Sequence, residues 1–191
     1  AVGRTQERSK VLFAAGVLAG EQGDYAAARA LIEESLAIAR ELQDRWGVAV
    51  ALNALAVFAR DRGDVPASRS LFEESLAIWR ELGDRSAVAR ALSNLANAVK
   101  TQGDHALAAS LYGQALSIFR ELGDRDGVGW TINYQGDVAR EQGEWQVART
   151  LYEQSLLSFR DLGDRWGSAS ALADLGNLAR DQRNHASCHD L

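Results

Sequence analysis

The sequence predicts an all-α protein, a solenoid of antiparallel helical hairpins. One stretch recurs with a period of 40 residues, as RELQDR, RELGDR, RELGDR and RDLGDR, beginning at Arg40, Arg80, Arg120 and Arg160. Pairs of a glycine and an acidic residue keep the same period: Gly23-Asp24, Gly63-Asp64, Gly103-Asp104 and Gly143-Glu144. Between these signals apolar residues recur at helical spacing. A fixed period of about 20 to 50 residues indicates stacked repeats.

Residues 46–84 show how each hairpin is built. Gly63 is placed to end the first helix in a left-handed conformation, and Asp64 to cap the second. Pro66 fits the first turn of that second helix, where its missing N–H is harmless. We expect the second helix to run to about Leu82. Apolar side chains form one face of the first helix, at Val48, Leu52, Leu55, Ala56 and Ala59.

The repeats extend along the whole chain. We expect one domain over residues 1–191, with repeats at about 5–44, 45–84, 85–124 and 125–164 and a partial repeat at 165–191. The partial repeat supplies one further helix, from Ser168 to about Asp181, before a faded turn signal at Arg183-Asn184. We expect that helix to bury Leu172, Leu175 and Leu178 against the fourth hairpin. The chain begins with alanine and contains no methionine, so we expect a fragment of a larger protein.

Aligning the repeats shows two positions that accept only small side chains. One lies in the first helices, at Gly16, Ala56, Ala96, Gly136 and Gly176, and the other in the second helices, at Ala28, Ser68, Ala108, Ala148 and Cys188. We expect the two helices of a hairpin to approach most closely there, so that added volume would overpack the contact. Larger residues flank these positions, at Leu12, Leu52, Leu92, Ile132 and Leu172, and at Ile32, Phe72, Tyr112 and Tyr152.

Composition limits the classes of protein and partner. The chain is 47% hydrophobic and 25% charged, which predicts a folded core rather than disorder. A net charge of −5 gives no electrostatic basis for binding nucleic acid or an anionic membrane. No apolar run approaches the roughly 20 residues of a membrane helix. The single cysteine, Cys188, favours a reducing compartment, and we expect a cytoplasmic protein.

These features resemble tetratricopeptide repeats. The resemblance rests on the small-residue positions, the turn Gly23-Asp24-Tyr25 and the run Leu71–Leu76, and it covers nearly the whole chain. The usual unit has about 34 residues, so the longer repeat here is similar to those of kinesin light chains and of sensor arrays in bacterial signal-transduction ATPases and regulators. The resemblance implies a right-handed superhelix whose first helices line a concave groove. It also implies a protein or peptide partner and a role in a bacterial regulatory protein.

On this resemblance, side chains beside the core face of the first helices would line the groove. Asparagine can bond a peptide backbone as donor and acceptor, arginine grips carboxylates, and an exposed tryptophan offers a flat surface for stacking. We therefore expect a peptide that carries acidic groups. The candidate residues are Phe13, Val17, Asn53, Arg60, Arg90, Asn97, Lys100, Trp130, Asn133, Tyr134, Arg140, Asn177 and Arg180.

Several of these residues have a simpler interpretation. The cations at three repeat positions each stand four residues before an acid, which would form ion pairs without any ligand. Asparagines on a solvated helix face need no function, and Trp130 would pack against Tyr134 one turn later. The three pairs are Arg60 with Asp64, Lys100 with Asp104, and Arg140 with Glu144.

Two other functions compete with peptide binding. The open ends of a solenoid expose apolar helix faces, so terminal helices would join two copies in a homodimer. A pocket around Phe13, Trp130 and Tyr134 would instead make the array a sensor of a small ligand or a signal peptide.

The sequence offers little support for chemistry at a metal or a catalytic centre. His185, Cys188 and His189 suggest a metal site, but repeat position explains the first two, so we expect no metal and no cofactor. Acidic pairs such as Glu33-Glu34 lie on the outer helices, away from any pocket. Every glycine cluster marks a helix end rather than a phosphate-binding loop. We expect no catalytic residues and no enzyme.

Overall fold

The computed structural model describes residues 3–189, with side chains described for residues 3–183 and for His185. Within these residues all regular structure is helical, which confirms the all-α class. The helices that start successive repeats begin at Arg45, Arg85, Arg125 and Arg165, the period of the sequence. The helices are α1 (Gln6–Glu21), α2 (Tyr25–Glu41), α3 (Arg45–Asp61), α4 (Val65–Leu82), α5 (Arg85–Thr101), α6 (His105–Leu122), α7 (Arg125–Glu141), α8 (Trp145–Leu162) and α9 (Arg165–His189).

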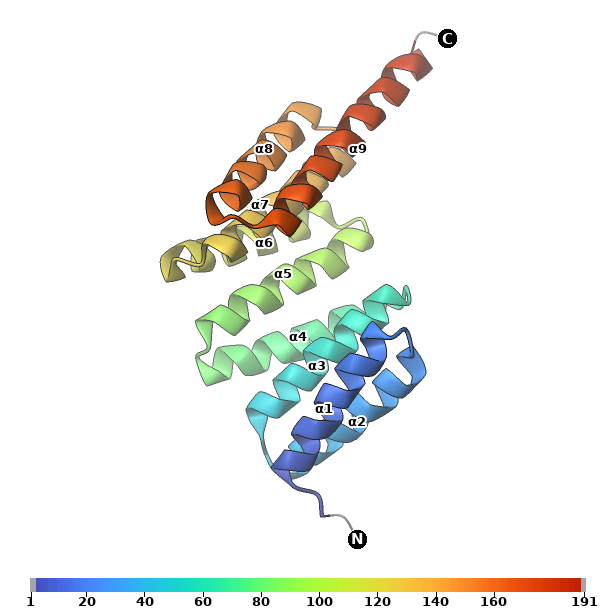
Figure 1. Cartoon of the computed structure of the whole chain (residues 1–191), viewed down its shortest axis with the longest axis vertical. Helices are drawn as coiled ribbons and strands as arrows, with labels where there is room; N and C mark the ends of the chain where they lie inside the picture. The colour runs from blue at the N-terminus through green and yellow to red at the C-terminus, as the bar shows by residue number, and fades with distance from the viewer. Residues whose placement is uncertain (1–2, 190–191) are drawn as a thin grey trace. The chain divides into compact units, whose positions relative to one another are not determined.

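The helices divide between two compact units. Unit 1 ends at Gln102 and holds α1 to α5, and unit 2 begins at Gly103 and holds α6 to α9. In unit 1, α1 packs against α2 and α3 against α4, while α2–α3 and α4–α5 contacts join the hairpins. In unit 2, α7 packs against α8 and α9, and α6 packs against α7 (Figure 1). Contacts of α1 with α3, of α3 with α5 and of α7 with α9 also place the first helices of successive repeats side by side within each unit.

The turns show why the repeated motifs recur. The Asp64 carboxylate accepts a hydrogen bond from the backbone N–H of Ala67 at 3.2 Å and caps α4. Gly83 ends α4 with φ of 71°, a left-handed conformation that costs glycine little. Gln43 occupies the same repeat position with φ of 56°, so the turn keeps its geometry without glycine. Glu144 stands at the start of α8 but makes no capping bond with its side chain.

The small-residue positions lie where the helices of a hairpin meet, as expected. A Cβ atom on Gly136 would lie 2.6 Å from the ring of Tyr152, and one on Gly16 would lie 2.6 Å from the Ile32 side chain. The large residues at this repeat position, Ile32, Phe72, Tyr112 and Tyr152, are each 0% exposed. Within the units, a small side chain opposite a large one therefore sets the packing of the α1–α2, α3–α4 and α7–α8 hairpins.

Buried serines add a contact that the sequence did not predict. The Ser75 hydroxyl donates to the backbone carbonyl of Ala49 at 2.9 Å, and the Ser155 hydroxyl donates to that of Gly129 at 3.0 Å. Both bonds join a second helix to the first helix of the same hairpin. They are satisfied polar contacts inside an apolar core, which a pattern of hydrophobicity does not reveal.

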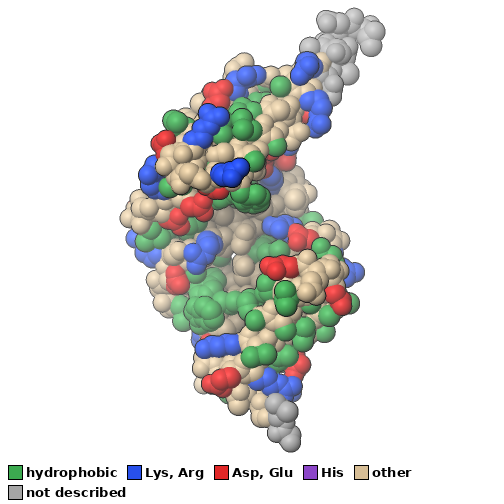
Figure 2. Space-filling model, viewed as in Figure 1, with side chains coloured by type: hydrophobic (Ala, Val, Ile, Leu, Met, Phe, Trp, Pro, Cys, Tyr) green, Lys and Arg blue, Asp and Glu red, His purple; other side chains and the backbone are tan. Residues whose placement is uncertain are grey.

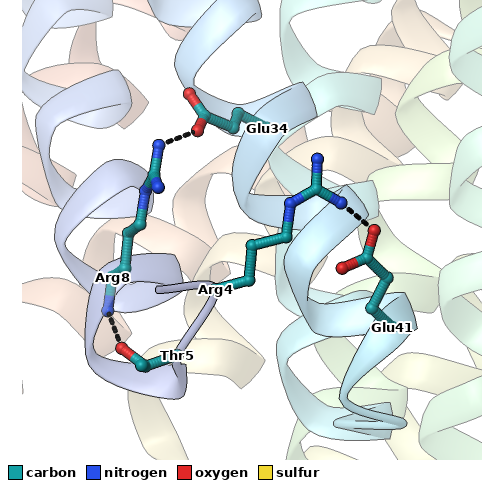
Figure 3. A network of polar contacts seen from close by, with 5 residues as sticks. All are labelled: Arg4, Thr5, Arg8, Glu34 and Glu41. Carbon is teal, nitrogen blue, oxygen red and sulfur yellow. Dashed lines mark hydrogen bonds and ion pairs between the residues drawn. The ribbon is translucent and has the colours of Figure 1, made fainter. Parts of the chain in front are cut away.

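The outer edge of the first hairpin is held by ion pairs. Arg8 on α1 pairs with Glu34 on α2, and Arg4 pairs with Glu41 near the end of α2 (Figure 3). The Thr5 hydroxyl accepts from the backbone N–H of Arg8 at 3.2 Å and caps α1. Such exposed pairs stabilise a fold by about 0 to 1 kcal/mol each. They favour the antiparallel register of α1 and α2 without determining it.

The last helix corrects three sequence predictions. We expected it to end near Asp181, before a turn at Arg183-Asn184, but α9 continues to His189. The reason is that Arg183 stands at the position where the other repeats have glycine, so the residue that should end the helix does not favour a left-handed turn. Leu172 is 49% exposed rather than buried. Gly176 has no atom within 4 Å of an added Cβ, because in the described residues no second helix covers this face of α9.

Leu178 is 0% exposed, and Leu175 is partly buried in the core of unit 2, as predicted. The side chains of Cys188 and His189, which the metal hypothesis involved, lie outside those that the structure describes. Over the residues that are described, no group of three His, Cys, Asp or Glu is arranged to hold a metal ion. None of the described helices has the length and apolar character needed to cross a bilayer.

Candidate functional site

Unit 1 contains a hollow lined by its first helices. This hollow has a volume of about 330 Å³ and lies among α1, α3 and α5, with Trp79 of α4 also on its wall. It brings together three of the predicted groove residues, Phe13, Asn53 and Arg90. Its other main lining residues are Trp46, Val50, Trp79, Asp84 and Asn94. A smaller depression beside it adds Lys10 and shares Phe13, Trp46 and Val50.

Two tryptophans form the apolar wall of the hollow. Trp46 is 53% exposed, whereas Trp79 is 6% exposed, and their ring centroids lie 6.2 Å apart in an edge-to-face arrangement. The buried Trp79 therefore holds Trp46 in place while one part of the Trp46 indole stays open to solvent. Sequence reasoning missed both residues as groove residues. Trp46 could have been recognised in the sequence, because it stands at the polar start of its helix, where no tryptophan is needed for the core.

The polar side of the hollow is ordered by hydrogen bonds. The Asn94 amide nitrogen donates to the Asn53 side-chain oxygen at 3.1 Å and links α5 to α3. Arg90 is exposed, and its guanidinium donates to the Ser86 hydroxyl at 2.7 Å. With Lys10 nearby, the hollow combines an indole wall, oriented amides and two cations. Figure 2 shows hydrophobic, basic and acidic side chains next to one another on the face of unit 1 in view.

In unit 2 the predicted residues Trp130 and Tyr134 belong to a row of aromatic rings. The ring centroids of Trp130 and Tyr134 lie 6.0 Å apart, which confirms the simpler interpretation that they pack together. Trp130 also meets Phe159 at 4.8 Å and Trp166 at 4.6 Å. Trp166 is 73% exposed and is not among the residues predicted from the sequence.

Two predicted groove residues of unit 2 are engaged in bonds between first helices. The Asn133 amide nitrogen donates to the Asp174 carboxylate at 2.8 Å, and Asn133 is only 2% exposed. The Arg140 guanidinium donates to the Asp181 carboxylate at 2.7 Å, rather than pairing with Glu144. Both bonds join α7 to α9. These residues thus fix the spacing of first helices in this structure.

A buried tyrosine lies beside these contacts. The Tyr152 hydroxyl donates to the Asp137 carboxylate at 2.9 Å. Burial raises the pKa of that hydroxyl well above its usual range, and the negative charge of Asp137 adds to the effect. Burial alone would lower the pKa of the Arg140 guanidinium. Its bonds with Asp181 and Tyr152 outweigh burial and raise that pKa. The group keeps Tyr152 neutral and Arg140 charged.

The remaining predicted residues lie on the first helices outside the hollow. Val17 is half-buried on α1, and Arg60 on α3 pairs with Asp61 at 2.9 Å instead of Asp64. On α5, the Asn97 amide donates to the Ser93 carbonyl at 3.2 Å, and Lys100 lies one turn later. The Arg180 guanidinium on α9 donates to the Asn177 side-chain oxygen at 3.0 Å.

Comparison with known proteins matches this architecture to one family. Models of the tetratricopeptide repeat match residues 47–121 and residues 15–42. A sequence search of curated proteins finds no match. Among solved structures, a kinesin light chain with nearly identical TPR-like repeats from Podosopora anserina has a TM-score of 0.73 at 18% identity, covering 96% of this chain and 92% of that one.

Two further solved structures share the fold but are longer. The Signal Transduction ATPase with Numerous Domains protein with a tetratricopeptide repeat sensor from Pyrococcus horikoshii has a TM-score of 0.80 at 12% identity. The match covers 100% of this chain and 32% of that protein. A Rap protein complexed with Competence and Sporulation Factor has a TM-score of 0.80 at 14% identity, with 97% of this chain and 55% of that one covered. The chain described here belongs to the tetratricopeptide repeat family.

Proposed function

We propose that this protein is a protein-interaction module that binds a peptide segment of a partner in the hollow of unit 1. The observation that carries the proposal is the juxtaposition of the open Trp46 indole with the linked amides of Asn53 and Asn94. An apolar side chain of the peptide would pack on the indole. The amides would bond its backbone, since each side-chain amide offers both donors and an acceptor.

Charge supports an acidic peptide at this site. Lys10 and Arg90 stand on either side of the Trp46 wall, one in the adjoining depression and one in the hollow. The Asp84 carboxylate, the acid in the hollow, is engaged in capping α5 through the backbone N–H of Ala87 at 2.9 Å. Asp44, which lines the depression with Lys10, likewise accepts from the backbone N–H of Gly47 at 2.9 Å. A peptide carboxylate would therefore meet two cations and two hydrogen-bonded acids. Val17, Arg60, Asn97 and Lys100 lie on the same first helices and would extend the contact.

A regulatory role follows as the finer part of the proposal. We place the module in a larger bacterial regulatory protein of the cytoplasm, where it would act as the sensor or scaffold and carry no catalysis of its own. The support is the shared fold with a signal-transduction ATPase that has a repeat sensor and with a Rap protein in complex with its factor. Both resemblances are at low identity and concern the fold.

Peptide selection tests the proposed ligand chemistry. A random dodecapeptide library is panned on the wild-type protein and on the variant Phe13→Ala/Arg90→Ala. Wild type is expected to enrich peptides with an apolar residue next to an acidic one, and the variant is expected to lose that enrichment. The control Val11→Ala/Arg69→Ala removes an exposed valine and an outer-helix arginine and should keep it. Equal enrichment on all three proteins would contradict the assignment to the hollow.

A second candidate function, self-assembly, is favoured by the uncovered face of α9. Leu172 is 49% exposed there, and Gly176 has open space beside it. The test residue is Leu172, because Leu178 and Leu175 pack within unit 2. Light scattering would show a concentration-dependent dimer for wild type and a monomer for Leu172→Glu. A monomer in both cases would remove this candidate.

A further inference from the structure

Two tryptophans of unit 2 form an aromatic platform that is open on one side. Trp130 on α7 lies between Phe159 and Trp166, with ring centroids at 4.8 Å and 4.6 Å. Phe159 is 0% exposed and belongs to the core, so the platform has a rigid base. The Trp166 indole, tilted by 44° to that of Trp130, remains 73% exposed.

Trp166 is exposed because of its position in the repeat, and not only because it lies in the last helix. Trp46 occupies the same repeat position in a hairpin that has both helices, and it is still 53% exposed. This position, one residue after the start of a first helix, therefore points an indole toward solvent in both units. An exposed tryptophan held by a second aromatic residue is a surface suited to recognition.

The platform differs in charge from the hollow of unit 1, because both sites have capping aspartates but the platform adds a further carboxylate, Asp126. The Asp126 carboxylate accepts a hydrogen bond from the indole N–H of Trp130 and lies near Asp124 and Asp164. Partial burial raises the pKa of Asp126, and the carboxylates of Asp164 and Asp124 raise it further. The guanidinium of the nearby Arg125 forms an ion pair with the Asp161 carboxylate at 3.8 Å.

Two of these carboxylates are fixed in place. The Asp124 carboxylate accepts from the backbone N–H of Gly127 at 2.9 Å, and the Asp164 carboxylate accepts from those of Trp166 and Gly167 at 2.9 and 3.1 Å. Their bonds cap α7 and α9 and hold the charges at the helix starts, beside the platform. Unit 1 has Gln6, Trp46 and Ser86 at the repeat position of Asp126, and Lys10, Val50 and Arg90 at that of Trp130.

We propose that Trp166 and Trp130 bind an arginine side chain of a partner peptide, with Asp126 as its carboxylate neighbour. A guanidinium is planar and weakly hydrated, so it stacks on an indole and donates to a carboxylate at the same time. This site goes beyond the proposed function, because it lies in unit 2 and uses no residue of the hollow. Its ligand chemistry is also the reverse of the acidic peptide proposed there.

The test uses indole N–H signals in ¹H–¹⁵N NMR spectra of the full chain. The probe is the blocked tripeptide acetyl-Gly-Arg-Gly-amide, and its partner probe carries citrulline, which keeps the shape of arginine but not the charge. The arginine probe is expected to shift the Trp166 and Trp130 signals saturably, in the range of about millimolar affinity. The citrulline probe should bind at least several-fold more weakly, because it lacks the cation.

Variants show which residues bind the arginine probe. Trp166→Ala should abolish the shift at Trp130, and Asp126→Asn should weaken binding about three- to five-fold. Leu157→Ala removes another exposed apolar side chain of unit 2, and Glu153→Gln removes an exposed charge elsewhere on α8. Both controls should retain wild-type affinity. Circular dichroism checks that Trp166→Ala remains folded, as its exposure predicts.

Three results would overturn the proposal. Equal shifts with the citrulline probe would show apolar stacking without recognition of charge. Unchanged titration of Trp166→Ala would place the arginine elsewhere on the protein. Equal weakening by Asp126→Asn and Glu153→Gln would show a response to net charge only. None of these results bears on peptide binding in unit 1, whose failure would be seen separately in the library selection.

Discussion

The side chain of Asn133 donates a hydrogen bond to Asp174 at 2.8 Å and ties α7 to α9, the first helices of successive repeats. An equivalent link joins Asn94 to Asn53 at 3.1 Å between α5 and α3. The two links occupy the same repeat positions in units 1 and 2. Side chains on the first helices therefore link successive repeats as well as forming the surface of the protein.

Replacing Asn133 by alanine tests the link in unit 2. Asn133→Ala leaves the half-buried Asp174 carboxylate without this donor, which should lower the free energy of unfolding by about 1 to 2 kcal/mol. Urea denaturation followed by circular dichroism measures the change. Asn177→Ala is the control on α9, and it should change stability by less than about 0.5 kcal/mol. Similar stabilities for the two variants would show that the link contributes little.

One repeat position allows opposite effects from the same substitution. Gly136→Ala would place a Cβ atom 2.6 Å from the Tyr152 ring, and overpacking of this kind should destabilise the fold by about 1 to 3 kcal/mol. Gly176→Ala meets no atom within 4 Å, so the higher helix propensity of alanine should stabilise by up to about 1 kcal/mol. Thermal unfolding distinguishes the two signs. Destabilisation by both substitutions would mean that the Gly176 face is covered in solution.

The start of α8 offers a stabilising substitution. Glu144 makes no capping bond, whereas Asp64 and Asp104 at the same repeat position each accept from a backbone N–H. The shorter side chain of Glu144→Asp should restore the cap and stabilise the protein by about 0.5 to 1 kcal/mol. Asp104→Glu should have the reverse effect. Chemical denaturation of both variants checks the pair, and equal midpoints would contradict it.

The buried tyrosine predicts a response to alkaline pH. The pKa of Tyr152 is raised in the folded protein, so its hydroxyl stays protonated when the unfolded chain begins to lose this proton, near pH 10. The unfolded state then binds fewer protons, and stability falls as pH rises above that value. Tyr152→Phe has no hydroxyl to lose this proton, so it lacks this pH-dependent loss of stability. Its destabilisation relative to wild type should shrink between about pH 9 and pH 11, and a constant difference would contradict the raised pKa.

Local signals explain why most of the fold was predictable from the sequence. Helix ends follow from residues such as Gly83 and Asp84, whose effects act within one turn of the chain. The pairing of Gly136 with Tyr152 follows from repeat alignment, because each repeat shows the same complement of small and large residues. The missed end of α9 has a local reason too, since Arg183-Asn184 weakened a turn signal without supplying a new helix stop.

The candidate site was harder to predict. Phe13, Asn53 and Arg90 were predicted to line a groove on the first helices, and the structure places them in one hollow. The link between Asn133 and Asp174 was missed, because it depends on how one first helix is offset against the next. Trp46 and Trp166 were missed because they stand at helix starts, outside the spacing that defines the core face.

Isothermal titration calorimetry is the most direct test of the central claim, that the hollow of unit 1 is the peptide-binding site. A peptide selected on the wild-type protein is titrated into wild type, Phe13→Ala/Arg90→Ala and the control Val11→Ala/Arg69→Ala. The hollow variant is expected to bind at least about ten-fold more weakly, since it loses an apolar contact and a cation, whereas the control binds as wild type does. Equal affinity for all three proteins would contradict the claim.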